Sequence, residues 1–127
     1  MSVILILDAE PLVRQTITRI LDQAGFTVLA AGDVAEALRL VQSSRPDLLL
    51  TNVYVPQSSG REAASLLKKL CPGMRTLMVA GLPDEEPIMT GIAASEVMDF
   101  FPKPFTAAEL TAKVRQLLDD VHDGTGR

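Results

Sequence analysis

The chain has 127 residues, of which 47% are hydrophobic and 22% charged, and its formal net charge is −4. This length matches one domain with its own hydrophobic core and leaves no room for a second domain. The negative charge and the scattered basic residues argue against direct binding of nucleic acid, which needs several lysines or arginines placed on the phosphates.

Short apolar runs alternate with amphipathic segments five times along the chain, which is typical of parallel strands joined by crossover helices. The first two strands are predicted at Val3–Leu7 and Thr27–Ala31. Between them, Pro11 suits the first turn of a helix whose apolar residues recur at helical spacing. Gly25 is predicted to end this helix as a C-cap.

Two capping boxes predict the start of the next two helices. Asp33 and Glu36 form one box, and Ser59 and Glu62 form the other. Between these helices, Asp47–Thr51 is apolar at nearly every position, as expected of a central parallel strand covered on both faces. The third helix is predicted to bury one stripe of side chains, which consists of Ala63, Leu66, Leu67 and Leu70.

The fourth and fifth strands are predicted at Thr76–Ala80 and Val97–Phe101. The intervening segment, residues 84–95, contains Pro87 and Gly91, which both oppose helix formation. We therefore expect a short and weakly stable helix there.

Thr106 and Glu109 form a third capping box, which predicts a last helix up to residue 121. We expect residues 1–121 to form the domain and residues 122–127 to form a flexible tail, because Asp119, Asp120 and Asp123 place negative charge near a helix C-terminus, where it opposes the macrodipole. Five strand–helix units in a chain of this length favour a doubly wound open α/β sheet over a barrel.

Ligands of such sheets bind at the carboxyl ends of the strands. Several polar and small residues are predicted at or just beyond that edge. They are Asp8, Ala9, Glu10, Asn52, Ala80, Gly81 and Lys103.

Three segments carry a resemblance to a known family. Residues 4–11, with Asp8 as the first acid, residues 46–56 followed by Gly60, and residues 99–105, with their Lys-Pro-Phe run, lie in a characteristic order and spacing. They resemble the response regulator receiver family of bacterial two-component signalling. The resemblance implies a flavodoxin-like (βα)5 sandwich with a five-stranded parallel sheet in the strand order 2-1-3-4-5.

The chain departs from the family pattern at three positions with defined roles. Asn52 stands where the resemblance places the phosphorylated aspartate, and a neutral amide is a poor nucleophile toward a phosphoryl donor. Ala9 stands where the resemblance places an acid that binds magnesium. Ala80 stands where the resemblance places a residue whose hydroxyl group acts in the family's conformational switch. We interpret the chain as a degenerate receiver, a pseudo-receiver, that signals by protein–protein contact without being phosphorylated and is not an enzyme.

Magnesium needs an oxygen-rich shell, and only Asp8 and Glu10 remain as candidate ligands at this edge. Lys103 adds a competing positive charge beside them. We therefore expect weak or absent Mg²⁺ binding and no cofactor. We favour a structural role for the remnant, in which Asp8 and Lys103 form an ion pair that holds two strand ends together and the Asn52 side-chain oxygen accepts from the Lys103 ammonium.

The expected partners are a histidine kinase, an output domain or another regulator. By the resemblance, the face of the fourth helix, fifth strand and fifth helix mediates output and is a candidate for homodimerisation. Phe100 occupies the switch aromatic position and is predicted to turn inward. The apolar residues assigned to this face are Ile88, Met89, Ile92 and Phe100.

Two alternatives remain open. The remnant cleft of Asp8, Asn52 and Lys103 is also compatible with binding a small ligand or anion, whereas a flavodoxin-like cofactor protein lacks support because acids follow the first strand. The single cysteine, Cys71, cannot form an internal disulfide, and no apolar run approaches the roughly 20 residues that span a bilayer. With no secretory leader apparent, we expect a cytoplasmic protein.

Overall fold

The structure is a computed structural model that describes residues 2–52, 54–55, 58–80, 98–102 and 106–126. Within these ranges, residues 54–55, 80, 98–102 and 119–126 are described by their backbone alone.

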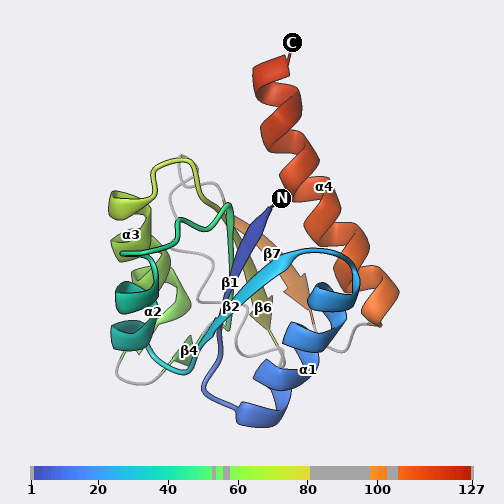
Figure 1. The fold of residues 1–127 in the computed structure, drawn as a ribbon. Coiled ribbons are helices and arrows are strands. Elements are labelled where there is room, and N and C mark those ends of the chain that lie inside the picture. The colour runs from blue at the N-terminus through green and yellow to red at the C-terminus, as the bar shows by residue number, and fades with distance from the viewer. Residues whose placement is uncertain (1, 53, 56–57, 81–97, 103–105, 127) are drawn as a thin grey trace.

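Five of the described strands form one parallel sheet in the order β2-β1-β3-β6-β7 (Figure 1). Every neighbouring pair in this sheet is parallel. The central position of β1 and β3 follows from their continuous apolar sequences, which need cover on both faces. The strands are β1 (Val3–Leu7), β2 (Thr27–Ala31), β3 (Leu48–Asn52), β6 (Arg75–Ala80) and β7 (Met98–Pro102).

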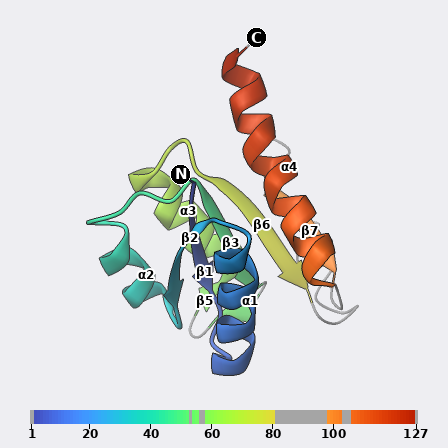
Figure 2. The same ribbon diagram turned by 45° about the vertical axis from the view of Figure 1, so that its right-hand side comes forward.

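Helices cover both faces of the sheet, as the predicted doubly wound, flavodoxin-like class requires. One face carries α1 (Pro11–Gln23) and α4 (Ala107–Gly126), and the other carries α2 (Val34–Leu40) and α3 (Gly60–Leu70) (Figures 1 and 2). The helix expected within residues 84–95 lies outside the described residues. None of the described helices has the length and apolar content needed to cross a membrane.

Two features differ from the expected elements. A short antiparallel hairpin of β4 (Tyr54–Val55) and β5 (Ser58–Ser59) lies between β3 and α3, where no strand was predicted. Helix α4 continues to Gly126, past residue 121, where the last helix was expected to end. Its second half extends beyond the body of the domain (Figure 1).

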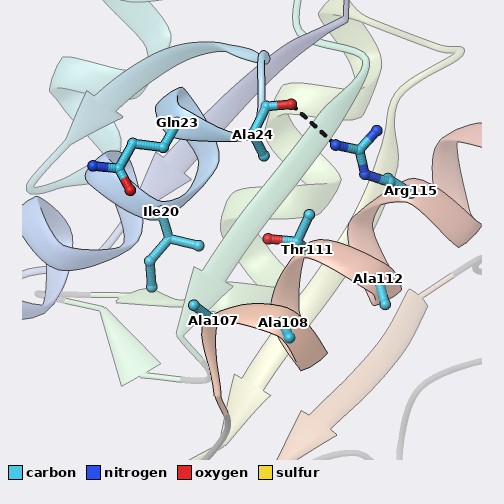
Figure 3. Close-up of a pocket in the computed structure, with 8 residues that line it drawn as sticks. All are labelled: Ile20, Gln23, Ala24, Ala107, Ala108, Thr111, Ala112 and Arg115. Atoms are coloured by element: carbon cyan, nitrogen blue, oxygen red, sulfur yellow. Dashed lines mark hydrogen bonds between the residues drawn. The ribbon is translucent and has the colours of Figure 1, made fainter.

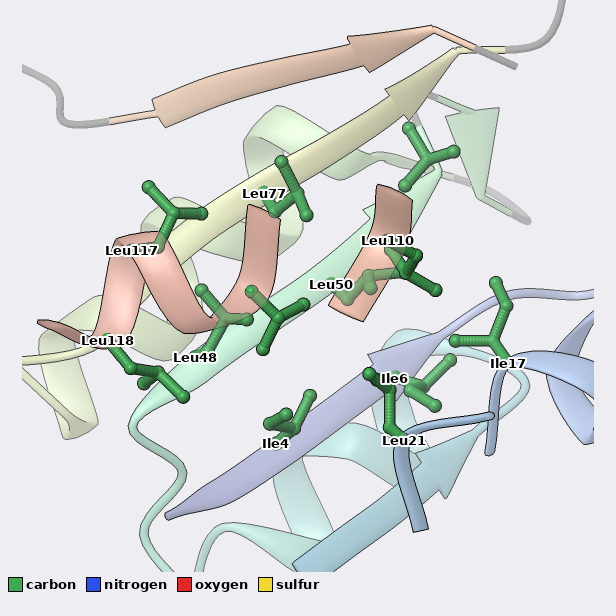
Figure 4. Packing of buried hydrophobic residues seen from close by; sticks show 12 residues of the cluster. Ile4, Ile6, Ile17, Leu21, Leu48, Leu50, Leu77, Leu110, Leu117 and Leu118 are labelled. Carbon is green, nitrogen blue, oxygen red and sulfur yellow. The ribbon is translucent and has the colours of Figure 1, made fainter. Parts of the chain in front are cut away.

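Alternation along the central strands divides the core into two layers. Ile4 and Ile6 contact the α1 and α4 side, whereas Leu5 and Leu7 contact the α2 and α3 side. Figure 4 shows the first layer, where Leu110 of α4 lies among side chains from the sheet and from α1. Burial of such side chains supplies the main driving force for folding, about 1.5–3 kcal/mol for each large one.

The prediction of a fully buried stripe on α3 was wrong for two of its four residues. Ala63 and Leu67 are fully buried, but Leu66 and Leu70 are 44% and 46% exposed. Gly60 and Ala64 complete the buried side of the helix, so the side that faces the sheet is made mostly of small residues. The two larger leucines lie at its margin.

The predicted helix caps are confirmed. The side chains of Asp33, Ser59 and Thr106 each accept a hydrogen bond from the backbone N–H three residues later, at 2.8, 3.1 and 3.0 Å. The Glu109 carboxylate also accepts from the Thr106 N–H at 2.7 Å, which completes a reciprocal capping box.

Gly25 lies one residue beyond the C-cap of α1, which is Ala24. Its φ of +100° permits a Schellman motif, in which the Phe26 N–H donates to the Leu21 carbonyl at 3.1 Å and the Gly25 N–H donates to Asp22 at 3.0 Å. These bonds satisfy carbonyls that the helix end leaves without intrahelical partners.

Replacing Gly25 with alanine should lower the free energy of unfolding by about 1–2 kcal/mol, because a β-carbon disfavours positive φ. No atom lies within 4 Å of the added methyl group, so the backbone alone is responsible. Gly73→Ala is the matched control, because Gly73 also has open space around it and no positive φ. Urea denaturation should show a loss for Gly25→Ala only, and equal stabilities of the two variants would contradict this account.

Candidate functional site

The parallel register brings the ends of the central strands to one edge of the sheet. Leu7 lies opposite Thr51, so Asp8 follows β1 at the level where Asn52 ends β3. Asn52 in turn lies opposite Val79 of β6. Asp8 and Asn52 therefore lie at the ends of adjacent strands, at the same edge of the sheet, as predicted from the sequence.

Asp8 is only 2% exposed and is held at three points. Its N–H donates to the Ala31 carbonyl at 3.0 Å, and its Oδ1 accepts from the Glu10 N–H at 2.9 Å. Its carbonyl accepts from Nη1 of Arg14 at 2.8 Å. These bonds fix both the backbone and the carboxylate at the end of β1.

Asn52 ends β3 with a half-buried side chain, and its backbone is tightly enclosed. The Thr51 hydroxyl donates to the Asn52 carbonyl at 3.0 Å. A β-carbon on Gly60 would overlap that carbonyl oxygen and would lie 2.9 Å from Sδ of Met78. Glycine at residue 60 therefore lets the start of α3 pack directly against the end of β3.

Thr51, next to Asn52, is a poor alternative phosphoryl acceptor. Adjacent residues of a strand point to opposite faces, and Thr51 is 0% exposed. Its hydroxyl is engaged with the Asn52 carbonyl. Solvent and a phosphoryl donor cannot reach it in this conformation.

Asp8 is the buried carboxylate that the described residues place at this edge. Ala9 contributes no oxygen from its side chain, and Glu10 is exposed. Among the residues that the structure describes, no three His, Cys, Asp or Glu side chains cluster in a way that could hold a metal ion. Magnesium is commonly held by one or two carboxylates together with water molecules, so the expected weak or absent Mg²⁺ binding stays a prediction.

Comparisons with known proteins identify the family. The model of the response regulator receiver domain matches residues 4–115. The chain belongs to the response regulator receiver domain family. Response regulator MprA of Mycobacterium ulcerans is 35% identical over 115 residues, which cover 91% of this chain and 49% of that protein. The MprA protein of Mycobacterium tuberculosis is 34% identical over the same length. The chain thus spans about half the length of these curated relatives.

Solved structures show the same fold for this receiver domain. The signal receiver domain of an HD domain-containing protein from Pseudomonas fluorescens has a TM-score of 0.85 and 26% identity, over 99% of this chain and 93% of that one. A CheY-like receiver domain from Methanospirillum hungatei has a TM-score of 0.83 and 25% identity, over 98% of each chain.

Sequence reasoning missed Arg14, whose guanidinium lies beside the receiver site. Besides its bond to the Asp8 carbonyl, its Nη1 would lie 3.0 Å from a β-carbon on Gly32. The Gly32 N–H donates to the Glu36 carboxylate at 2.9 Å. The available signal was a basic residue in the second turn of a helix that begins at the ligand-binding edge.

Several predicted site residues are not described. Gly81, Ile88, Met89, Ile92 and Lys103 lie outside the described residues, so the ion pair of Asp8 with Lys103 stays a prediction. Ala80 and Phe100 are described by backbone alone, in β6 and β7. The inward turn of Phe100, worth about 2–3 kcal/mol of burial, also stays a prediction.

An open groove of about 480 Å³ lies between α1 and α4, on the face of the sheet that Figure 3 shows. Arg115 closes one end, because its Nη2 donates to the Ala24 carbonyl at 3.0 Å and its guanidinium lies 5.3 Å from the centroid of the Phe26 ring. Neither Asp8 nor Asn52 lines this groove. The lining residues are Ile20, Gln23, Ala24, Ala107, Ala108, Thr111, Ala112 and Arg115.

Gly60→Ala should lower the free energy of unfolding by about 1–3 kcal/mol, because the new methyl group overlaps backbone that cannot retreat. Gly32→Ala is the control, since its methyl group would meet only the ends of two flexible side chains, those of Arg14 and Glu36. In chemical denaturation, Gly60→Ala should lose more free energy of unfolding than Gly32→Ala. Amide NMR shifts near Asn52 should move in Gly60→Ala alone, and an unchanged spectrum would refute the contact.

Proposed function

We propose that this receiver domain signals by phosphorylation-independent contact with other proteins and is a pseudo-receiver. The observation that carries the proposal is Asn52 at the end of β3, in the position that the family resemblance gives to the acceptor aspartate. An aspartate attacks a phosphoryl donor through a carboxylate oxygen, whereas a carboxamide is neutral and weakly nucleophilic.

Two further residues support the proposal because they weaken the remaining steps of the reaction. Ala9 removes the carboxylate that would help neutralise the transferred phosphoryl group through a magnesium ion. Ala80 has no hydroxyl that would hydrogen-bond to an attached phosphoryl group. The phosphoryl acceptor, a candidate magnesium ligand and the hydroxyl that would sense the phosphoryl group are thus all replaced. The fold around these three positions is that of a receiver domain.

A protein partner of the two-component type fits this reading. Receiver domains act beside histidine kinases and output domains, and one similar solved structure is the receiver domain of a histidine kinase from Syntrophus aciditrophicus, at 25% identity and a TM-score of 0.80 over 95% of this chain and 92% of that one. The partner of this chain would bind a surface that is formed when the domain folds and that does not change by phosphorylation. The face assigned to Ile88, Met89, Ile92 and Phe100 remains our hypothesis for output or homodimerisation.

The alternative of a small anionic ligand has less support. The Asp8 carboxylate is buried at this edge and would repel an anion beside it. Its Oδ1 already accepts the Glu10 N–H, so that amide is not directed toward a ligand.

Incubation with acetyl phosphate and Mg²⁺, followed by intact mass measurement, tests the proposal. The wild-type chain should gain no phosphoryl group, because Asn52 supplies no carboxylate. The combined variant Ala9→Asp, Asn52→Asp and Ala80→Thr should gain one, because the same scaffold then presents an acceptor, a second acid and a hydroxyl.

The single variant Asn52→Asp restores the acceptor carboxylate but leaves Ala9 and Ala80 in place. It should therefore gain the phosphoryl group more slowly than the combined variant. Circular dichroism verifies that each variant is folded. A stoichiometric adduct on the wild-type chain would overturn phosphorylation independence, and its position would follow from peptide mapping.

A further inference from the structure

Two exposed leucines lie one turn apart near the C-terminus of α3. Leu66 is 44% exposed and Leu70 is 46% exposed, and no other described leucine except Leu12 is as accessible. Residues four apart on a helix are neighbours on its surface, so the two side chains form one apolar strip.

Basic groups flank this strip. Lys69 lies on the same side of α3, three residues after Leu66, and is exposed. The exposed Arg45, in the connection between α2 and β3, donates from Nη1 to the Leu70 carbonyl at 2.6 Å. The guanidinium is therefore held beside the end of the strip. Glu62, one turn before Leu66, is the acid on this side, and its N–H is bonded to the Ser59 hydroxyl.

The stretch of sequence that contains the strip is positively charged, whereas the whole chain is negatively charged. Residues 37–80 contain six basic and two acidic residues, although the complete chain has a net charge of −4. The acidic residues are thus concentrated elsewhere. A local positive field on an acidic protein favours approach of a partner with negative charge.

A purely structural role explains the basic residues only in part. Lys68, Lys69 and Arg45 complement the negative end of the α3 macrodipole, and Arg45 satisfies a terminal carbonyl. Stabilising the end of the helix in this way does not require Leu66 and Leu70 to be exposed beside these basic residues.

We propose that Arg45, Leu66, Lys69 and Leu70 form a docking site, the basic–leucine surface, for an acidic segment of a partner protein. The segment would place apolar side chains on the two leucines and carboxylates beside Lys69 and Arg45. This surface is separate from the edge that holds Asp8 and Asn52, so its use does not depend on whether the domain is phosphorylated.

Other occupants fit the observations less well. A symmetric dimer through this surface would bring the same basic groups of both copies together, which costs free energy. Two half-exposed leucines give a smaller apolar face than a helix needs to lie in a membrane surface. A nucleic acid duplex would pair with the basic groups but leave the leucines without an apolar partner.

Amide NMR titration of the full chain tests the proposal, with a synthetic helical peptide of about 15 residues as the probe. The peptide carries leucines at positions i, i+4 and i+7 with glutamates beside them, and matched peptides replace the glutamates with lysine or the leucines with serine. We expect shifts confined to the second half of α3 and the residues around Arg45 with the acidic leucine peptide alone. Binding should weaken as ionic strength rises from about 0.01 M to 0.1 M, because the Debye length falls from about 30 Å to about 10 Å.

The double variant Leu66→Ser, Leu70→Ser should bind the acidic peptide about tenfold more weakly or worse, because it removes the apolar anchors at the centre of the contact. Lys69→Gln should weaken binding less and reduce its salt dependence. Leu12→Ser and Arg19→Gln are the controls, since both residues are exposed on α1 and lie off the proposed surface. Thermal denaturation verifies that every variant is folded.

Three results would overturn the proposal. The first is equal binding of the lysine peptide, or shifts that map to another surface. The second is a wild-type dimer in analytical ultracentrifugation that Leu66→Ser, Leu70→Ser abolishes, which would identify a second copy as the occupant. The third is binding of duplex DNA or of phosphatidylserine vesicles through this surface without binding of the acidic peptide.

Discussion

Polar contacts at the ends of β1 and β3 fix the register on which the site depends. Both strands are apolar on both faces, so side-chain polarity alone does not prevent a shift by one residue. Asp47 supplies the constraint at one end, where its N–H donates to the Val3 carbonyl at 2.7 Å and its Oδ2 accepts from the Val3 N–H at 2.8 Å. At the other end, the Asp8 N–H donates to the Ala31 carbonyl at 3.0 Å, which fixes β1 against β2. Asp8 and Asn52 reach the same edge because the Asp47 contacts hold β3 in register with β1.

The burial of Asp8 gives this acid a structural role that is independent of phosphoryl transfer. An ionised carboxylate inside a protein is costly unless hydrogen bonds or charges offset its lost hydration. The Glu10 N–H supplies one such bond at 2.9 Å. Asp8 also orders the start of α1 through this bond, a structural role that does not require a metal ion. Residue 9 is exposed and carries no such role, so an alanine there leaves the local fold intact.

The sequence predicted the elements whose signals are local. The capping residues Asp33, Ser59 and Thr106 and the glycine after α1 act within one turn, and each was identified correctly. The β4–β5 hairpin was missed because each strand has two residues, too few for a periodic pattern. Helical spacing also failed to distinguish Leu67 from its neighbours on α3.

The reason for that failure is geometric. A helix packed on a sheet buries a narrow side when that side consists of small residues, and α3 places Gly60, Ala63 and Ala64 there. Spacing identifies which residues lie near the apolar side but not how wide the contact is, which depends on the partner surface. The contacts of Arg14 escaped prediction for a related reason, because they join the start of α1 to the residues that follow β1 and β2.

Helix α3 physically connects the candidate site with the basic–leucine surface. Its first residue, Gly60, packs against the Asn52 carbonyl, and its last turn carries Leu70. With 11 residues, the helix spans about 16 Å as a single rigid element. The close packing at Gly60 fixes where the helix begins and thereby where its last turn presents Leu66 and Leu70. On our proposal Asn52 accepts no phosphoryl group, so binding at the basic–leucine surface does not require a change at the end of β3.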